Sequence, residues 1–157
     1  MKVLIVYDSQ FGNTEKLAKA IADAIDSKED IHVVQANTVN AEDMKGLDIL
    51  IVGSPIHAWG PTRVIKSFMK SLGPEILSGV RAAAFDTGYP SRMAGSAAKQ
   101  IEKALRKAGC SIVVPARKFI VTGNKGPLAD GELDNAVAWA KEIKQIFETK
   151  PTKLPPQ

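Results

Sequence analysis

Short apolar runs alternate with longer amphipathic segments along this chain. The apolar runs predict strands, because continuous apolar stretches of this length are typical of strands covered on both faces. In the amphipathic segments apolar residues recur every three or four positions, which predicts helices. The predicted strands are residues 3–7, 31–35, 49–53 and 81–85, with a fifth at 111–114 and 119–121 that Pro115 can interrupt; the predicted helices are residues 14–27, 64–72, 96–108 and 130–148.

This alternation predicts an α/β fold, with a parallel sheet covered by helices on both faces. The sequence contains no internal repeat and no linker that would divide it. A length of 157 residues suits one domain with a full core. We therefore expect one domain over residues 1–149 and a disordered tail over residues 150–157, where prolines break regular structure.

Composition narrows the class of protein. No apolar run reaches the roughly 20 residues that span a bilayer. The beginning, MKVLIVYDS, lacks the apolar length of a secretory signal, so we interpret it as a strand. The single cysteine, Cys110, excludes an internal disulfide and a multi-cysteine metal site. We expect a cytoplasmic protein that has no membrane span and no bound metal.

Charge is distributed unevenly. The net charge is +4, but the first 60 residues are net acidic and the remainder is strongly basic. Lys99, Lys103, Arg106 and Lys107 recur at helical spacing, which is typical of the solvated face of an amphipathic helix. Since no basic tract, zinc-finger spacing or aromatic RNA-binding signature accompanies them, we do not expect a nucleic-acid partner.

Three loops follow predicted strands: residues 8–14, 54–61 and 86–95. In open parallel sheets, ligands bind beyond the carboxyl ends of the strands, where the strand order reverses. These loops are therefore the candidate binding site.

The first loop, SQFGNT, leads directly into a predicted helix. Free amide groups and the helix dipole at such a point favour an anion. The side chains of Ser9, Asn13 and Thr14 can donate hydrogen bonds to it, and Gly12 lets the backbone come close. The segment has no lysine or arginine, so neutral groups would bind the anion. The alternative is an ordinary turn in which Asn13 or Thr14 caps the helix.

The segment VLIVYDSQFGNTEKLAKAI resembles the phosphate-binding signature of the flavodoxin family. The similarity extends from residue 2 to about residue 148, and the absence of a long insertion in the fifth strand is similar to short-chain flavodoxins. The resemblance implies a flavodoxin-like three-layer sandwich, with a five-stranded parallel sheet in the order 2-1-3-4-5 and FMN at its edge. The residues at the family's spacing are Ser9, Gly12, Thr14, Ala18 and Ile21.

The resemblance also implies which residues hold the cofactor. Trp59 stands where flavodoxins place an aromatic residue against the isoalloxazine, and indole offers a large flat surface. Tyr89 is the candidate for stacking on the outer flavin face, and the third loop brings backbone close to the flavin. The expected cofactor-binding residues are Ser9, Gln10, Phe11, Gly12, Asn13, Thr14, Ser54, Pro55, Ile56, His57, Ala58, Trp59, Gly60, Thr87, Gly88, Tyr89 and Gly95.

Two features depart from the family's pattern. Flavodoxins often carry acidic residues in the third loop, whereas this chain has Arg92 there, with Arg63 and Lys66 across the expected site. Basic side chains near a flavin should raise its potential and favour an acidic partner or the phosphates of a nicotinamide donor. For Lys66 we favour an ordinary solvated charge.

The second departure is Gly60–Pro61. In flavodoxins the peptide after the loop aromatic turns over when the flavin takes up one electron. If the register holds, this peptide is Gly60–Pro61, and proline has no N–H to offer the oxidised flavin. We then expect the one-electron-reduced state to be relatively favoured, and Pro61→Ala to lower the first reduction potential.

Several conspicuous side chains are predicted to have structural roles. Trp139 lies in the last predicted helix and is expected to pack in the core. Cys110 is expected to be a small core residue. His57 is interpreted as a surface-loop residue without a catalytic role, although histidine titrates near neutral pH.

The function implied by the resemblance is that of an FMN-binding flavodoxin, a low-potential protein that shuttles single electrons between redox partners. No side chain then needs to be catalytic, because the cofactor carries the chemistry. The alternative is a flavodoxin-like NAD(P)H-dependent quinone or flavin reductase; a module that has lost flavin is a third possibility. The expected partner is a redox protein, acidic and ferredoxin-like, or a reductase, and the expected state is a monomer or weak dimer.

Overall fold

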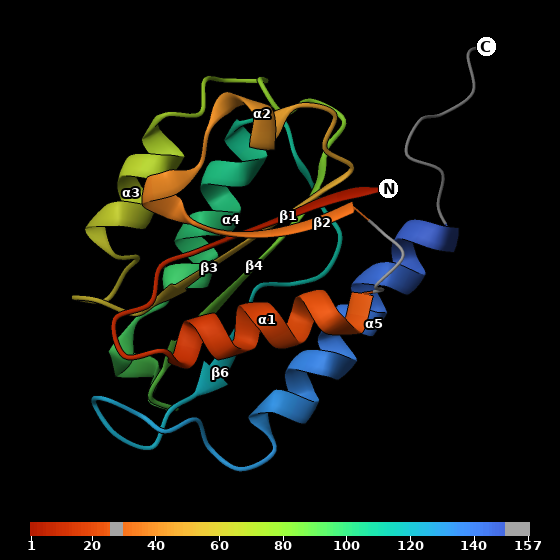
Figure 1. Ribbon diagram of the computed structural model, residues 1–157. Coiled ribbons are helices and arrows are strands. Elements are labelled where there is room, and N and C mark those ends of the chain that lie inside the picture. Colours follow the sequence, from red (N-terminus) through yellow and green to blue (C-terminus); the bar gives the residue numbers. More distant parts are fainter. Residues whose placement is uncertain (26–29, 150–157) are drawn as a thin grey trace.

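The computed structural model describes residues 1–25 and 30–149; the predicted tail at residues 150–157 lies outside the described residues. One parallel sheet forms the centre of the molecule (Figure 1). Its strands are β1 (Lys2–Tyr7), β2 (Asp30–Gln35), β3 (Ile49–Pro55), β4 (Arg81–Gly88), β5 (Ser111–Ile112) and β6 (Arg117–Ile120). The order is β2-β1-β3-β4-β5, and β6 also pairs with β4. This confirms the predicted order 2-1-3-4-5.

Helices cover both faces of the sheet (Figure 1). They are α1 (Asn13–Ile25), α2 (Ala41–Met44), α3 (Arg63–Lys70), α4 (Ala97–Lys107) and α5 (Glu132–Thr149), with short 3₁₀ turns η1 (Ala36–Thr38) and η2 (Arg92–Ala94). Side chains alternate along β1, so that Val3 and Ile5 pack against α1 and α5 while Leu4 and Val6 pack against α3 and α4. The sheet therefore separates two apolar cores.

The predicted fifth strand is two separate strands. β5 pairs with the first two residues of β4, and β6 pairs with its last four. Pro115 lies between them and has no N–H to donate to β4. The next residue, Ala116, donates its N–H to Glu102 Oε2 at 2.9 Å instead. The interruption displaces the chain locally but leaves the strand order unchanged.

β3 and β4 extend further than the sequence predicts. The apolar runs end at Gly53 and Phe85, but the strands continue through buried polar residues such as Ser54 and Asp86. These side chains can be buried because the hydroxyl oxygen of Ser54 accepts the Thr62 N–H at 3.1 Å, and the Asp86 carboxylate accepts an N–H at the start of α4. The strands thus bring polar groups to the edge where the loops begin.

Phe85 of β4, Phe119 of β6 and Trp139 of α5 form an aromatic cluster between the sheet and this helix. Their ring centroids lie 5.9–6.1 Å apart in edge-to-face arrangements, which aromatic pairs prefer. Trp139 is 4% exposed and Cys110 is 7% exposed, which confirms both as core residues. Among the described residues, no helix is long and apolar enough to span a membrane.

Candidate functional site

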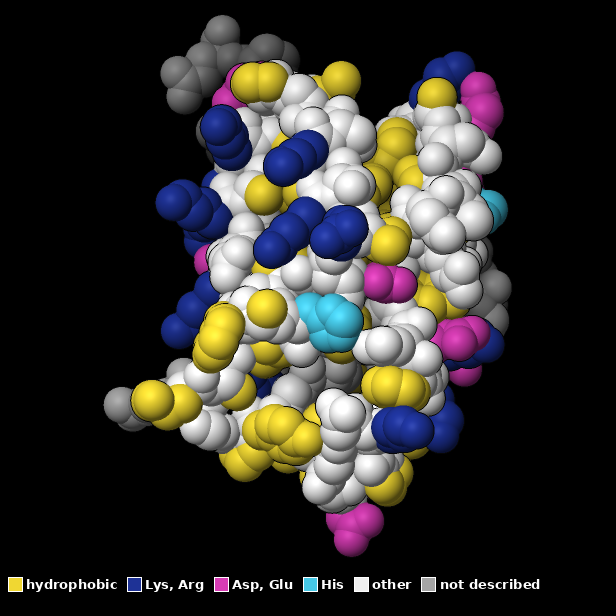
Figure 2. Space-filling view, turned by 90° about the vertical axis from the view of Figure 1, so that its left-hand side faces the viewer, with side chains coloured by type: hydrophobic (Ala, Val, Ile, Leu, Met, Phe, Trp, Pro, Cys, Tyr) yellow, Lys and Arg dark blue, Asp and Glu magenta, His cyan; other side chains and the backbone are white. Residues whose placement is uncertain are grey.

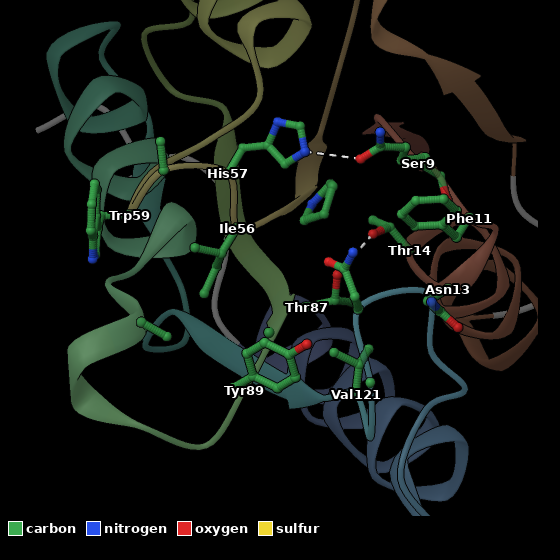
Figure 3. Close-up of a pocket in the computed structure, with 17 residues that line it drawn as sticks. Ser9, Phe11, Asn13, Thr14, Ile56, His57, Trp59, Thr87, Tyr89 and Val121 are labelled. Carbon is green, nitrogen blue, oxygen red and sulfur yellow. Dashed lines mark hydrogen bonds between the residues drawn. The ribbon is translucent and has the colours of Figure 1, made fainter.

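Four loops enclose a pocket of about 350 Å³ at the carboxyl ends of the sheet strands (Figure 3). The three predicted loops are brought together there, although they are far apart in the sequence. A fourth loop, after β6, closes the remaining side. The lining residues are Ser9, Gln10, Phe11, Asn13, Thr14, Pro55, Ile56, His57, Ala58, Trp59, Thr87, Gly88, Tyr89, Ala94, Val121, Gly123 and Asn124.

The first loop offers a set of free amide groups. The Ser9 hydroxyl oxygen accepts the N–H of Gly12 at 3.1 Å and that of Glu15 at 3.3 Å, so Ser9 takes the capping role that the alternative reading gave to Asn13 or Thr14. The N–H groups of Gln10, Phe11, Asn13 and Thr14 have no partner within the described residues. Such amides at a helix N-terminus form an anion-binding site.

Two side-chain contacts tie this loop to its neighbours. The buried hydroxyl groups of Thr14 and Thr87 are 3.1 Å apart and share a hydrogen bond. At the mouth of the pocket, His57 Nε2 lies 2.9 Å from Gln10 Oε1 (Figure 3). The imidazole of His57 is exposed, as predicted, and links the first loop to the second.

The second loop is a tight hairpin. His57 and Gly60 exchange two backbone hydrogen bonds, of 2.7 Å and 3.0 Å. The two central residues, Ala58 and Trp59, both have positive φ, of 46° and 67°, as a two-residue turn of this hand requires. The turn directs Trp59 outward, and its side chain is 68% exposed at one end of the pocket (Figure 3).

This hairpin contains the two peptides that bear on the Pro61 expectation. The Gly60 carbonyl accepts the His57 N–H, so the carbonyl of the Gly60–Pro61 peptide is hydrogen-bonded within the turn. The central peptide differs, because the Ala58 carbonyl and the Trp59 N–H have no partner in the described part of the chain. In this conformation the Ala58–Trp59 peptide is thus the one with unpartnered polar groups among the described residues, and the effect of Pro61 on the flavin stays a prediction.

The third loop is held by contacts with Trp59 and Lys118. A Cβ on Gly95 (φ 81°) would lie 2.5 Å from the Trp59 carbonyl oxygen, so only glycine allows this approach. Lys118 Nζ donates to the carbonyl groups of Tyr89 and Gly95, both at 3.2 Å. The Tyr89 ring is 45% exposed and points into the pocket from below in Figure 3.

Asp86 joins the third loop to α4. One carboxylate oxygen accepts the N–H of Ala98 at 2.9 Å and the Ser96 hydroxyl at 3.3 Å. The other oxygen, Oδ1, is buried without a partner in the described residues. Burial raises the pKa of this carboxyl group, and the nearby N–H groups, the Ser96 hydroxyl and the charge of Lys118 oppose the rise.

Four expected cofactor-binding residues do not line the pocket. Ser54 is buried and braces Thr62 through its hydroxyl group. Gly60 closes the hairpin, where a Cβ would lie 2.9 Å from Gln100 Nε2. Gly95 packs under Trp59 instead of approaching the pocket. Gly12 (φ 93°) allows the turn before α1. All four shape the loops whose neighbouring residues form the walls.

The fourth loop is the part of the site that the sequence analysis missed. Val121, Gly123 and Asn124 line the pocket. Beside them, the Lys125 carbonyl accepts a hydrogen bond from Asn13 Nδ2 at 3.2 Å. The ammonium group of Lys125 lies 5.9 Å from the Phe11 ring centroid. A cation thus lies next to the first loop. The glycine, asparagine and proline residues of TGNKGP indicate a loop in the sequence. Because the strand before them is interrupted, the sequence did not show that this loop lies at the same end of the sheet as the other three.

The expected basic residues lie outside the pocket wall. Arg63 and Lys66 are exposed on the first turn of α3, and neither lines the pocket. The backbone of Arg92 lies in η2, and its side chain is outside the described part of the structure.

The pocket fits a flat aromatic molecule that carries a phosphate group. The exposed Trp59 ring stands at one end, with Ile56 between it and the first loop, and the exposed Tyr89 ring lies below them (Figure 3). Free amides gather at the other end. Gly88 keeps the floor open, because a Cβ there would lie 2.6 Å from Ile56 Cδ1. Apolar walls with few polar groups are the usual form of a cofactor site.

Comparisons with known proteins agree with this fit. The family model described as a flavodoxin domain matches residues 4–123. A flavodoxin of Maridesulfovibrio salexigens is 29% identical over 90% of this chain and 96% of its own. A flavodoxin of Clostridium beijerinckii is 32% identical over 69% of this chain and 79% of its own. An archaeal flavodoxin structure superimposes with a TM-score of 0.77 at 26% identity, over 92% and 97% of the two chains. The chain therefore belongs to the flavodoxin family, whose cofactor is FMN.

Proposed function

We propose that this protein is a low-potential carrier that holds FMN without a covalent bond and passes single electrons between redox proteins. The observation that carries the proposal is the pairing, in one pocket, of the free amides of the first loop with the exposed rings of Trp59 and Tyr89. The amides suit a phosphate group, and the rings suit a flat apolar one.

In this proposal each loop has a separate task. The N–H groups around Gln10 and Asn13 bind the phosphate, and Thr14 and Thr87 lie between the two ends of the pocket. Trp59 and Tyr89 cover the ring system and keep water from it. FMN supplies the redox chemistry, while the chain determines its orientation and exposure. No side chain acts as acid, base or nucleophile.

Stepwise anaerobic photoreduction of the FMN-loaded protein tests the proposal. If the protein separates the two one-electron steps, a long-wavelength absorption band of the one-electron-reduced flavin will rise and then fall. Direct passage from the oxidised to the two-electron-reduced spectrum would overturn the carrier proposal. The NAD(P)H-dependent reductase would then become the better candidate, and NADH oxidation with a quinone acceptor would be the assay.

The proposal also covers the partner, the cellular location and the oligomeric state of the protein. We propose an acidic redox protein or a reductase as the partner, a cytoplasmic location, and a monomer or weak dimer in solution. The strongly basic second part of the chain supports an acidic partner, and the single cysteine supports a cytoplasmic location.

A further inference from the structure

Two neighbouring helices, α3 and α4, carry a stripe of positive charge. The cations of this stripe are Arg63, Lys66 and Lys70 on α3 and Lys99 and Lys103 on α4, whose last turn also carries Arg106 and Lys107. We call the five residues of this stripe the basic face. All are exposed. Among the described residues none of them forms an ion pair, whereas the neighbouring Arg106 pairs with Glu102 at 3.2 Å.

Acidic side chains are scarce on these helices. α3 contains none, and α4 contains only Glu102. That carboxylate is occupied, because one oxygen contacts Arg106 and the other accepts the Ala116 N–H. Figure 2 shows Lys and Arg side chains gathered on the side of the molecule where α3 lies in Figure 1. The potential over this face is therefore positive.

The basic face begins at the rim of the pocket. α3 starts directly after the Trp59 hairpin, and α4 is tied to that hairpin at its own start. The Trp59 carbonyl accepts the Ser96 N–H at 3.3 Å and Gln100 Nε2 at 3.2 Å. Two large apolar side chains extend the surface there, since Trp59 is 68% exposed and Met93 is 84% exposed. Positive charge and apolar surface thus adjoin the proposed flavin site.

We infer that the basic face, together with Trp59 and Met93, is the docking surface for a redox protein with an acidic face. This inference rests on the proposed function as an electron carrier. Complementary charge steers encounter and sets orientation, and an apolar patch with a charged surround is the usual anatomy of a protein interface. Docking here brings the partner to the rim of the flavin pocket. Nucleic acid fits less well, because the exposed Trp59 and Met93 would gain no phosphate contact.

Binding of a small two-iron ferredoxin of net negative charge tests the inference. The affinity is measured by calorimetry at ionic strengths of about 0.02 M and about 0.5 M, where the screening length differs severalfold. We expect binding that weakens with salt, and at least about tenfold weaker binding by the double variant K66E/K103E. The matched control K19E/K141E changes the net charge equally on α1 and α5, and should weaken binding less than about twofold.

A second readout separates this inference from the proposed function. Both double variants should bind FMN and show the same photoreduction spectra as the unaltered protein, because neither change touches the pocket. Electron transfer to the ferredoxin, followed by stopped flow, should slow about tenfold in K66E/K103E alone. Loss of the one-electron step in the unaltered protein would defeat the carrier proposal itself.

Other outcomes overturn the docking inference. One is equal ferredoxin binding by the unaltered protein and K66E/K103E, and another is binding by neither protein. A third is a shift of duplex DNA that depends on Lys66 and Lys103 while electron transfer is unaffected, which would assign the face to nucleic acid. A fourth is a rise in the KM for NADPH confined to K66E/K103E, which would assign it to a nicotinamide donor.

Discussion

Ser9 organises the first loop through a single hydroxyl oxygen. It accepts two backbone N–H groups, at 3.1 Å and 3.3 Å, and this leaves the remaining amides of the turn free to face an anion. We expect Ser9→Ala to weaken FMN binding by about tenfold to a hundredfold, because the same hydroxyl group can donate to the phosphate and hydrogen bonds that involve a charged group contribute about 1.5–3 kcal/mol. The binding is measured by fluorescence quenching of the free flavin.

Riboflavin, which lacks the phosphate group, is the matched ligand control for Ser9→Ala. Its affinity should change less than about threefold, because the altered groups face the phosphate and not the ring. Ser67→Ala, on the exposed face of α3, is the control variant and should leave both affinities unchanged. Equal losses for FMN and riboflavin would mean that Ser9 shapes the whole pocket and does not act on the phosphate.

Asp86 gives the stability of the protein a defined dependence on pH. Burial raises the pKa of its carboxyl group above the ordinary value of 3.8, so the folded state binds a proton that the unfolded state has released. Between 3.8 and the raised pKa, the free energy of unfolding therefore falls as pH rises. Below this window the two states are equally protonated, and above it both are ionised.

Asp86→Asn should remove this contribution while keeping an oxygen that can accept the Ala98 N–H. Urea unfolding of the FMN-free proteins at successive pH values measures the free energy of unfolding. The free energy of unfolding of the original protein, relative to that of the variant, should be highest at low pH and should decline as pH rises through the window. Parallel pH curves for the two proteins would contradict this assignment.

At the scale of elements, the order of the strands and long helices could be predicted, because the strands are continuous apolar runs and the helices have a clear helical period; the single-turn helix α2 (Ala41–Met44) is too short to show one. The ends of β3 and β4 could not, since Ser54 and Asp86 are polar and only their tertiary hydrogen bonds permit burial. Contacts between loops that are distant in the sequence could not be predicted either. Nothing near Gln10 indicates His57 as its partner, and nothing near Phe11 indicates the cation of Lys125.

The packing between β3 and β4 depends on the absence of a side chain at Gly53. A Cβ there would lie 2.1 Å from Phe85 Cζ. The Phe85 ring cannot retreat, because Phe119 and Trp139 contact it edge to face. We expect Gly53→Ala to lower the free energy of unfolding by about 1–3 kcal/mol or more, as measured by urea denaturation.

Gly73→Ala, in the segment between α3 and β4, is the matched control for Gly53→Ala. Apart from its chain neighbours, no atom of the described residues lies within 4 Å of a Cβ built on Gly73, and the φ of Gly73 is not in the left-handed region. An added methyl group should therefore change stability by no more than about 1 kcal/mol, and the change can be favourable. If Gly53→Ala proved as mild as this control, the strands would have to separate easily, and the sheet would be less tightly packed than its geometry indicates.

At the scale of the whole molecule, cofactor binding and folding should be linked. Cys110 lies just before β5, at the opposite edge of the sheet from the pocket, where bound FMN cannot cover it. The thiol is buried in the core beneath α4, and burial raises its pKa to about 11. A thiol reagent at pH 8 should therefore react with Cys110 only when the domain opens.

If the domain opens as one cooperative unit, FMN will slow this reaction although it binds elsewhere. A ligand that binds only the folded state stabilises it by RT ln(1 + [L]/Kd). At a free FMN concentration of about 100 times Kd, labelling of Cys110 should therefore slow about a hundredfold. In urea, where the chain is unfolded, FMN should have no effect on the rate. A native labelling rate that is independent of FMN would show that the layer around α4 and β5 opens locally, without disrupting the pocket.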